Sequence, residues 1–365
     1  MADKAEKSGN IYSNFDARFR SQEDRFGLSR EALSALPVID IAPLVQESSS
    51  LAERQAVGRK IRAASVNLGF FYAVGHGITQ SELNELNGWV HRFFELPFNE
   101  KMKLDNSKRP WKLGYLQTGG TNADATADTR ESFHMSRELE PGEQSSPSLG
   151  AGLSVWPDPD VLPGFSAFIK NHIAKRVTVA RKLVRGLALS LELPETYFDE
   201  MFRYPGGFLS FNYYPPKSPE AGKRKQWGIS PHSDYSGFTM LSQDEHGGLE
   251  VRNSAGEWVN VTPLEGAFVV NIADLLAIWT NDLFAPALHR ASNVRSDVAR
   301  VSVPLFFGPS DDTVVSCLET CQSPDNPPRY TPRTAGAHVL ALLQASHDAG
   351  RIITGDETAR RLNEA

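Results

Sequence analysis

The sequence predicts a mixed α and β fold, in which a β-rich core, a barrel or double-sheet jelly roll, carries flanking helices and follows a helix-rich N-terminal half. Two observations lead to this prediction. Before residue 205, apolar residues recur at helical spacing in several long segments. After residue 205, short runs of β-branched and aromatic residues alternate with turn residues, a spacing typical of barrels and jelly rolls.

Composition narrows the class of protein. The chain has 365 residues, of which 40% are hydrophobic and 22% are charged, enough for a substantial buried core. A formal net charge of -6 argues against a nucleic-acid surface, and the longest apolar runs are far short of a membrane span. We therefore expect a small-molecule substrate, no nucleic-acid or membrane partner, and a monomer or weak homodimer.

The N-terminus and the cysteines indicate an intracellular setting. MADKAEKSGN lacks the apolar core of a secretory signal. Cys317 and Cys321 are the only cysteines, and two thiols without a second pair fall short of a zinc site. We expect a cytoplasmic protein with two structural thiols.

The predicted elements follow in chain order. Residues 1–35 are charged and poor in apolar residues, which predicts a flexible arm. A helix at 51–68 leads into the strand GFFYAVGHGI, and further helices are expected at 81–94 and 163–191. Residues 106–130, rich in Gly, Asn, Thr and Asp, predict long loops that border a pocket. Residues 36–204 are thus a helix-rich region that packs on the core.

The core is predicted at residues 205–320 and a closing helical segment at 321–365, with 36–365 as one structural unit. GLEVRNSAGEWVNVTP predicts a hairpin that turns at Asn253 to Gly256, and AHVLALLQASHD predicts the closing helix. The remaining β-rich runs are FLSFNYY, FTMLSQD, GAFVVNI and ARVSVPLFF.

His232 and Asp234 are the first candidates for chemistry. Residues i and i+2 of an extended strand point to the same face, so both side chains can bind one ion. The spacing alone does not decide, because about one His-x-Asp/Glu is expected by chance in a chain of this composition.

His289, 55 residues after Asp234, supplies a third candidate ligand. Antiparallel strands can return it to the mouth of the same barrel. Two imidazoles and one carboxylate on one face of an octahedral ion leave three positions open, the arrangement of non-haem Fe(II) oxygenases. The open face can bind a cosubstrate and O2.

A carboxylate anchor is predicted on two strands. Arg300 and Ser302 point the same way on one strand, and a guanidinium beside a hydroxyl suits the end carboxylate of a keto acid. Asn212 and Tyr214 share one face of another strand, which Pro215 and Pro216 end.

The sequence resembles the Fe(II)- and 2-oxoglutarate-dependent dioxygenases of the isopenicillin N synthase-like group. The likeness runs from about Leu36 to Phe307 in family order. Its motifs are PVIDIAPL, GFFYAVGHGI, NYYPP, PHSDYSGFTMLSQD, GGLEV, a G-x-W hairpin, VVNIADLLAIWTND, LHRASN and RVSVPLFF. The chain departs from plant members, because Lys217 and Ser218 follow NYYPP where they usually carry a cysteine.

The resemblance implies a double-stranded β-helix, or jelly-roll, core. It implies that His232, Asp234 and His289 bind Fe(II), and that Arg300 and Ser302 hold the distal carboxylate of 2-oxoglutarate. Tyr214 and Asn212 would assist them.

The implied reaction oxidises an unactivated C-H bond of a small metabolite, of the kind found in secondary metabolism, with release of succinate and CO2. Hydroxylation is the default outcome, and desaturation or oxidative cyclisation are variants of it. Two alternatives stay open. One is a 2-oxoglutarate-independent oxidase or cyclase of the isopenicillin N synthase type, and the other is a non-catalytic, metal-dependent jelly-roll binding protein.

Substrate residues are the weakest part of the prediction. Phe211 and Phe307, together with Phe306, are candidates to line the substrate space, although apolar strand residues are more often plain core. Arg130 is a further candidate contact. The histidines outside the triad are expected to be structural or surface residues: His76, His91, His134, His172, His246, His338 and His347.

Overall fold

The computed structural model describes residues 32–107, 109, 112–117, 129–144, 151–216, 227–284, 286, 288–295 and 297–349. Most of the predicted N-terminal arm, much of the loop expected at 106–130 and the insertion at 217–226 lie outside these described residues. No helix within the described ranges is both long enough and apolar enough to cross a membrane.

An eight-stranded main sheet forms the wall of the fold. Neighbouring strands are antiparallel, except β1 and β2, which run parallel. In spatial order the strands are β1 (Val38–Asp40), β2 (Phe70–Val74), β10 (Phe268–Ile272), β7 (Phe238–Gln243), β12 (Arg300–Gly308), β5 (Gly206–Tyr214), β4 (Glu131–Ser136) and β3 (Gly114–Leu116). The sheet thus combines strands from both halves of the chain.

A four-stranded minor sheet faces the main sheet. Its antiparallel strands are β6 (Ile229–His232), β11 (His289–Ala291), β8 (Leu249–Arg252) and β9 (Trp258–Asn260). Strands β8 and β9 form the predicted hairpin, whose turn is closed by the bond from the Gly256 amide to the Asn253 carbonyl. A separate pair consists of β13 (Val314–Val315) and β14 (Arg333–Thr334).

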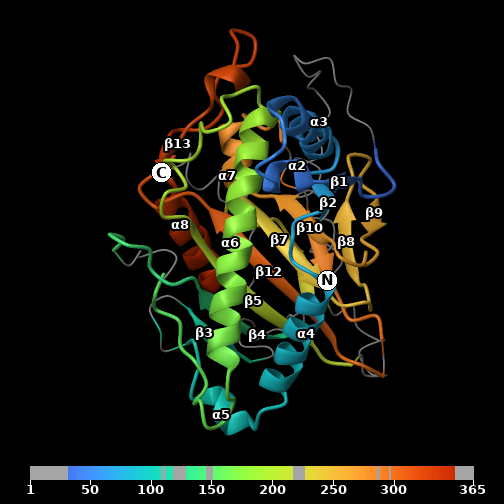
Figure 1. The fold of residues 1–365 in the computed structure, drawn as a ribbon, viewed down its shortest axis with the longest axis vertical. Helices are drawn as coiled ribbons and strands as arrows, with labels where there is room; N and C mark the ends of the chain where they lie inside the picture. The colour runs from blue at the N-terminus through green and yellow to red at the C-terminus, as the bar shows by residue number, and fades with distance from the viewer. Residues whose placement is uncertain are drawn as a thin grey trace, which may run out of the picture.

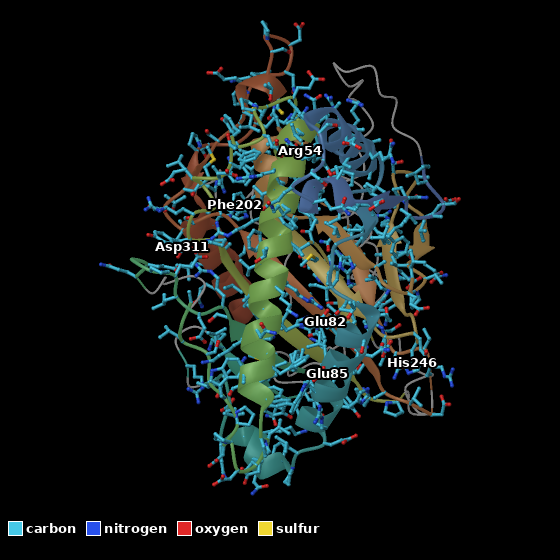
Figure 2. The ribbon with its side chains drawn as sticks, viewed as in Figure 1. Arg54, Glu82, Glu85, Phe202, His246 and Asp311 are labelled. Carbon is cyan, nitrogen blue, oxygen red and sulfur yellow. The ribbon has the colours of Figure 1, made fainter. Side chains whose placement is uncertain are left out.

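Helices cover the other face of the main sheet, and α6 crosses this face along most of the length of the molecule (Figure 1). The helices are α2 (Ala42–Val45), α3 (Leu51–Asn67), α4 (Gln80–Phe94), α5 (Phe98–Met102), α6 (Phe165–Ser190), α7 (Asp274–Trp279) and α8 (Ala335–Ala349), with a 3-10 turn at Glu319–Cys321. Capping boxes at Ser50 and Thr79 fix the starts of α3 and α4. Glu82 of α4 reaches across to Lys175 of α6, and Figure 2 shows it beside that helix.

Strand alternation divides the apolar side chains between two cores. On the outer face of the main sheet, toward α6, lie residues such as Phe133, Phe211 and Val303. On the inner face, toward the minor sheet, Tyr72 and Val269 share a second core with minor-sheet residues. The inner face therefore lines the space between the sheets.

The predicted fold class is confirmed. The helices expected at 51–68, 81–94 and 163–191 match α3, α4 and α6 to within a few residues. One correction concerns the segment at 106–130, which was expected to be loop but contains β3. Strand β4, directly after this segment, was not predicted either, because its short run ESFHMS has no β-branched residue.

Candidate active site

Three side chains with metal-binding atoms converge between the sheets. His232 ends β6 and His289 begins β11, and the two are register partners in the minor sheet. Their Nε2 atoms each lie 3.7 Å from Oδ1 of Asp234. One ligand atom from each residue lies within 4.8 Å of the others, and all three residues are buried. The predicted triad is thus brought together, although β6 ends at His232 and Asp234 lies in the turn that follows it.

Neighbouring groups orient two of the three ligand side chains, His232 and Asp234, toward the common centre. Nδ1 of His232 lies 2.8 Å from the Ser230 carbonyl, to which it donates, so Nε2 keeps its lone pair. Oδ2 of Asp234 accepts hydrogen bonds from Thr239 Oγ1 at 2.5 Å and Asn271 Nδ2 at 2.8 Å. These bonds leave Oδ1 facing the two histidines, the arrangement by which an outer shell orients metal ligands.

The protonation states also suit a metal ion. Burial lowers the pKa of His232 to about 3, and His289 acts in the same direction, so the His232 imidazole is neutral. Burial opposes ionisation of Asp234, but the two imidazoles and the bonds from Asn271 and Thr239 outweigh it and lower its pKa. A buried carboxylate beside neutral imidazole is a donor set that fits Fe(II).

Arg300 is a buried cation on the inner face of β12, with 1% of its surface exposed. Its Nε donates to the Gly247 carbonyl, and Nη2 donates to Oε1 of Gln243 at 3.2 Å. Nη1 has no hydrogen-bond partner among the described residues. A buried guanidinium with neutral partners and an unused donor fits an anionic ligand, because burying an unpaired charge is costly.

The other predicted anchor residues surround Arg300. Arg300 and Tyr214 are register partners across β12 and β5, and so are Ser302 and Asn212. The Arg300 guanidinium lies 4.6 Å from the centre of the Tyr214 ring. The Tyr214 and Ser302 hydroxyls are 3.4 Å apart. All four predicted side chains therefore meet on one patch of the inner face.

Arg130 also lies at this patch. Its Nε donates to Ser132 Oγ at 2.9 Å, and Ser132 Oγ donates to Asn212 Oδ1 at 2.9 Å. Burial lowers the pKa of His232 and of His134, and the positive charge of Arg130 acts in the same direction on both.

Phe211 and Phe307 do not join the site. Phe211 packs against Phe133 and Phe165 in the outer core, and Phe307 stacks on Phe202 there. Since neighbours in a strand point to opposite faces, the inward position of Asn212 sends Phe211 outward. This placement argues against the substrate role predicted for both residues.

Only some of the residues that line the inner face were identified from the sequence. Phe306, considered with the other two phenylalanines, pairs with Phe208 and Thr239 across three strands. Phe208, Thr239 and Asn271 were not singled out. Counting in twos from Asn212 and Ser302 would have found Phe208 and Phe306, whereas the bonds from Thr239 and Asn271 to Asp234 had no signal in the sequence.

Arg290, next to His289, contacts side chains of three neighbouring segments at the minor sheet. Its guanidinium lies between two rings, 4.2 Å from the centre of Trp227 and 3.9 Å from that of Trp258. It also forms a two-pronged ion pair with Glu250. The Trp227 carbonyl accepts bonds from the amide and hydroxyl of Thr129, at 3.1 and 3.2 Å. Trp227 therefore joins the chain before β4 to the chain before β6.

The fold and the site together define the class of protein. Two histidines and one aspartate sit inside a jelly roll, beside a buried arginine that can receive an anion. This combination is typical of non-haem Fe(II) oxygenases that use a keto acid.

Comparison with known proteins supports the same class, a non-haem Fe(II) oxygenase. Residues 36–159 match the N-terminal family model of non-haem dioxygenases in morphine synthesis, and residues 205–309 match the 2OG-Fe(II) oxygenase superfamily. The chain is 37% identical over 320 residues to a 2-oxoglutarate-Fe(II) type oxidoreductase, ppzC, of Metarhizium majus. This alignment covers 82% of this chain and 85% of that protein. It is 33% identical over 300 residues to a homoarginine-6-hydroxylase of Oryza sativa subsp. japonica, at 79% and 90% coverage.

A solved structure shows the same fold. A full-length Neurospora crassa protein, in complex with alpha-KG and thymine, superposes with a TM-score of 0.77 at 23% identity, over 87% of this chain and 99% of that one. The chain belongs to the 2OG-Fe(II) oxygenase superfamily. The predictions of an oxidoreductase that depends on Fe(II), 2-oxoglutarate and O2 are thereby confirmed.

Proposed function

We propose that the protein hydroxylates a C-H bond of a small organic molecule at an Fe(II) ion held by His232, Asp234 and His289. Arg300 and Ser302 bind the distal carboxylate of 2-oxoglutarate, with Tyr214 and Asn212 beside them. The observation that carries the cosubstrate assignment is the unused Nη1 donor of Arg300, buried on the same inner face as the triad.

The bound ion and cosubstrate supply the redox chemistry: O2 is consumed, one oxygen atom enters the substrate and the other enters succinate as CO2 leaves. The chain supplies position. Thr239 and Asn271 hold Asp234 with Oδ1 inward. The buried Phe70 ring packs edge-on against the His289 ring, with 5.3 Å between the ring centroids.

A metabolite-sized substrate is supported by the relatives. One is named for hydroxylation of homoarginine, and the Neurospora crassa protein is solved with thymine, both small molecules. The cytoplasmic location and the monomeric or weakly dimeric state remain predictions.

The test is to supply Fe(II), 2-oxoglutarate and O2 with a panel of small metabolites, and to compare succinate with oxidised product. We expect equal amounts of the two for one substrate class. His289→Ala should lose iron and succinate formation, whereas the matched variant His246→Ala should keep both. His246 follows β7, is partly exposed and is none of the three proposed ligands; it is labelled in Figure 2.

Three other outcomes would contradict the metal assignment or support one of the two alternative functions. Full iron occupancy and turnover in His289→Ala would contradict the metal assignment. Substrate-dependent O2 consumption without succinate would indicate an oxidase or cyclase of the isopenicillin N synthase type. Metal binding without any O2 consumption would indicate a binding protein.

A further inference from the structure

Gln243 lies beside the buried Arg300 on the inner face of the main sheet. It ends β7 and is the register partner of Ser302 on β12. Its Oε1 accepts a hydrogen bond from Arg300 Nη2 at 3.2 Å, and its Nε2 donates to the Val261 carbonyl at 3.4 Å. An arginine only donates hydrogen bonds, so the amide oxygen, and not the amide nitrogen, must face it. Gln243 therefore binds one donor of Arg300 without adding a charge.

The other contacts of Arg300 are neutral as well. Nε donates to the Gly247 carbonyl, and the guanidinium lies 4.6 Å from the centre of the Tyr214 ring. In the described part of the chain, no carboxylate forms an ion pair with this guanidinium, and Nη1 has no hydrogen-bond partner. The protein thus orients the Arg300 cation but does not neutralise it.

A double-glycine turn brings the Gly247 carbonyl to Arg300. Gly247 and Gly248 have φ of +73° and +93°, a region that other residues rarely adopt. A Cβ on Gly248 would lie 2.0 Å from the Ser292 carbonyl oxygen and 3.6 Å from Cδ of Arg300. The turn therefore needs glycine to pass this close, and it provides Arg300 with a second neutral acceptor.

The acid next to Gln243 in the sequence, Asp244, binds backbone amides instead of Arg300. Its Oδ2 accepts from the Val301 amide at 2.5 Å, and its Oδ1 accepts from the His246 amide at 3.0 Å. Neighbouring residues of an extended chain point to opposite sides. The order Gln-Asp thus places the neutral amide beside Arg300, whereas the order Asp-Gln would place a carboxylate there.

We propose that Gln243 is a positioning residue that makes the site specific for a keto acid with a second carboxylate. This inference rests on the proposed function, in which Arg300 binds the distal carboxylate of 2-oxoglutarate. Gln243 orients the guanidinium through a neutral oxygen, so the charge of Arg300 stays available to the cosubstrate. A carboxylate in its place would pair with Arg300 and compete with the cosubstrate, because an ion pair is stronger inside a protein than in water.

The experiment compares two keto acids that differ only at the distal end. 2-Oxoglutarate carries the distal carboxylate, and 2-oxopentanoate has the same chain length but ends in a methyl group. Calorimetric titration of the Mn(II)-loaded protein with each acid gives the ratio of their affinities. The wild type should bind 2-oxoglutarate about 30-fold or more tightly, because only this acid can pair with Arg300.

Three variants test the role of the neutral oxygen. In Gln243→Glu the ratio should fall by at least about tenfold, because the new carboxylate occupies Arg300. Gln243→Met also loses the bond to Val261 but adds no charge, and its ratio should fall by less than about fivefold. Gln46→Glu makes the same chemical change at an exposed residue and should leave the ratio unchanged. Each ratio is taken within one variant, so a general loss of stability does not move it.

The outcomes separate this inference from the proposed function. If the wild type binds neither keto acid with Mn(II), or binds both equally, the proposed function fails and the role of Gln243 fails with it. If the wild type prefers 2-oxoglutarate and Gln243→Glu keeps the same ratio, the inference fails and the proposed function stands. The inference also fails if Gln243→Met lowers the ratio as far as Gln243→Glu, since the amide would then act through its shape and not through its neutrality.

Discussion

The guanidinium of Arg176 donates a hydrogen bond to the backbone carbonyl of Val303, with 2.7 Å between Nη1 and the oxygen. The same nitrogen lies 3.4 Å from the Met240 carbonyl, Nη2 donates to the Ser242 hydroxyl, and Nε donates to Nε2 of His172 at 2.8 Å. Arg176 is fully buried on α6. It therefore fastens the helix to the two strands that carry Ser302 and Thr239.

Arg176→Met should lower the free energy of unfolding by about 2 to 4 kcal/mol, because it leaves several buried acceptors without a donor. Pro304, beside Val303, contributes no amide to the central strand β12, so this part of the sheet depends more on donors from outside. Denaturant unfolding gives the measurement. Arg185→Met on the same helix removes a half-exposed pair with Asp199 and should cost under about 1 kcal/mol. Equal effects of the two variants would contradict this role for Arg176.

Thr239→Val should weaken iron binding about 10- to 100-fold, because Asp234 then loses one of the bonds that orient its carboxylate. Thr239→Ser keeps the hydroxyl and should restore most of the affinity. Iron affinity is measured by competition with a chelator. Wild-type affinity in Thr239→Val would show that Asn271 alone is enough to orient Asp234.

Arg300→Leu should weaken 2-oxoglutarate binding by about 2 to 5 kcal/mol at equal iron loading, since the distal carboxylate is left without a cation in a buried site. The matched control Arg203→Leu changes an exposed arginine and should leave the affinity as it is. Titration of the iron-loaded protein with 2-oxoglutarate gives both values. An unchanged affinity in Arg300→Leu would place the anchor elsewhere.

His338 should make the protein less stable in acid. Burial lowers its pKa to about 3, with Arg333 acting in the same direction, and neither ring nitrogen has a hydrogen-bond partner among the described residues. An unfolded histidine titrates near about 6.5. Between these two pKa values the unfolded chain binds a proton at His338 that the native state does not bind. The contribution of His338 to stability is therefore fully present above a pH of about 6.5. It is lost as the pH falls, by about 1.4 kcal/mol per pH unit.

His338→Leu should reduce the slope of the unfolding free energy against pH between roughly pH 6 and pH 4. The reduction should reach up to about 1.4 kcal/mol per pH unit, which corresponds to the uptake of one proton on unfolding. The half-exposed His91 offers the matched control, His91→Leu, which should leave most of the slope in place. The prediction fails if the slope of His338→Leu equals that of the wild type.

The metal triad and the Arg300 patch were predictable because each depends on two rules that act along the chain. Rare residue types stand at fixed spacing, as in His232 and Asp234, and strand alternation sets direction, as in Arg300 and Ser302. The same alternation sends Phe211 and Phe307 to the face opposite Asn212 and Ser302. Their selection as substrate residues had treated all aromatic residues near the motifs as equivalent, without regard to the face on which each lies.

Other contacts depend on packing between distant segments. The Arg176 bonds require α6 to lie across β7 and β12, and the sequence marks them only by a charged residue within an apolar helical face. Asn271 reaches Asp234 because β10 pairs with β7, which no local pattern specifies. Strand β4, whose sequence resembles a loop, places His134 beside Ser210 of β5 in the same way.

The hydrogen bonds from Thr129 to the Trp227 carbonyl hold together two points of the chain that lie outside the metal triad. Residue 129 follows the segment 118–128 and residue 227 follows the segment 217–226, so each segment ends at a fixed point outside the triad. Arg290 then ties Trp227 to the hairpin of β8 and β9, beside His289. Either segment can be lengthened, shortened or exchanged during evolution, or replaced by design, while the strand that carries His232 starts from the same anchored position.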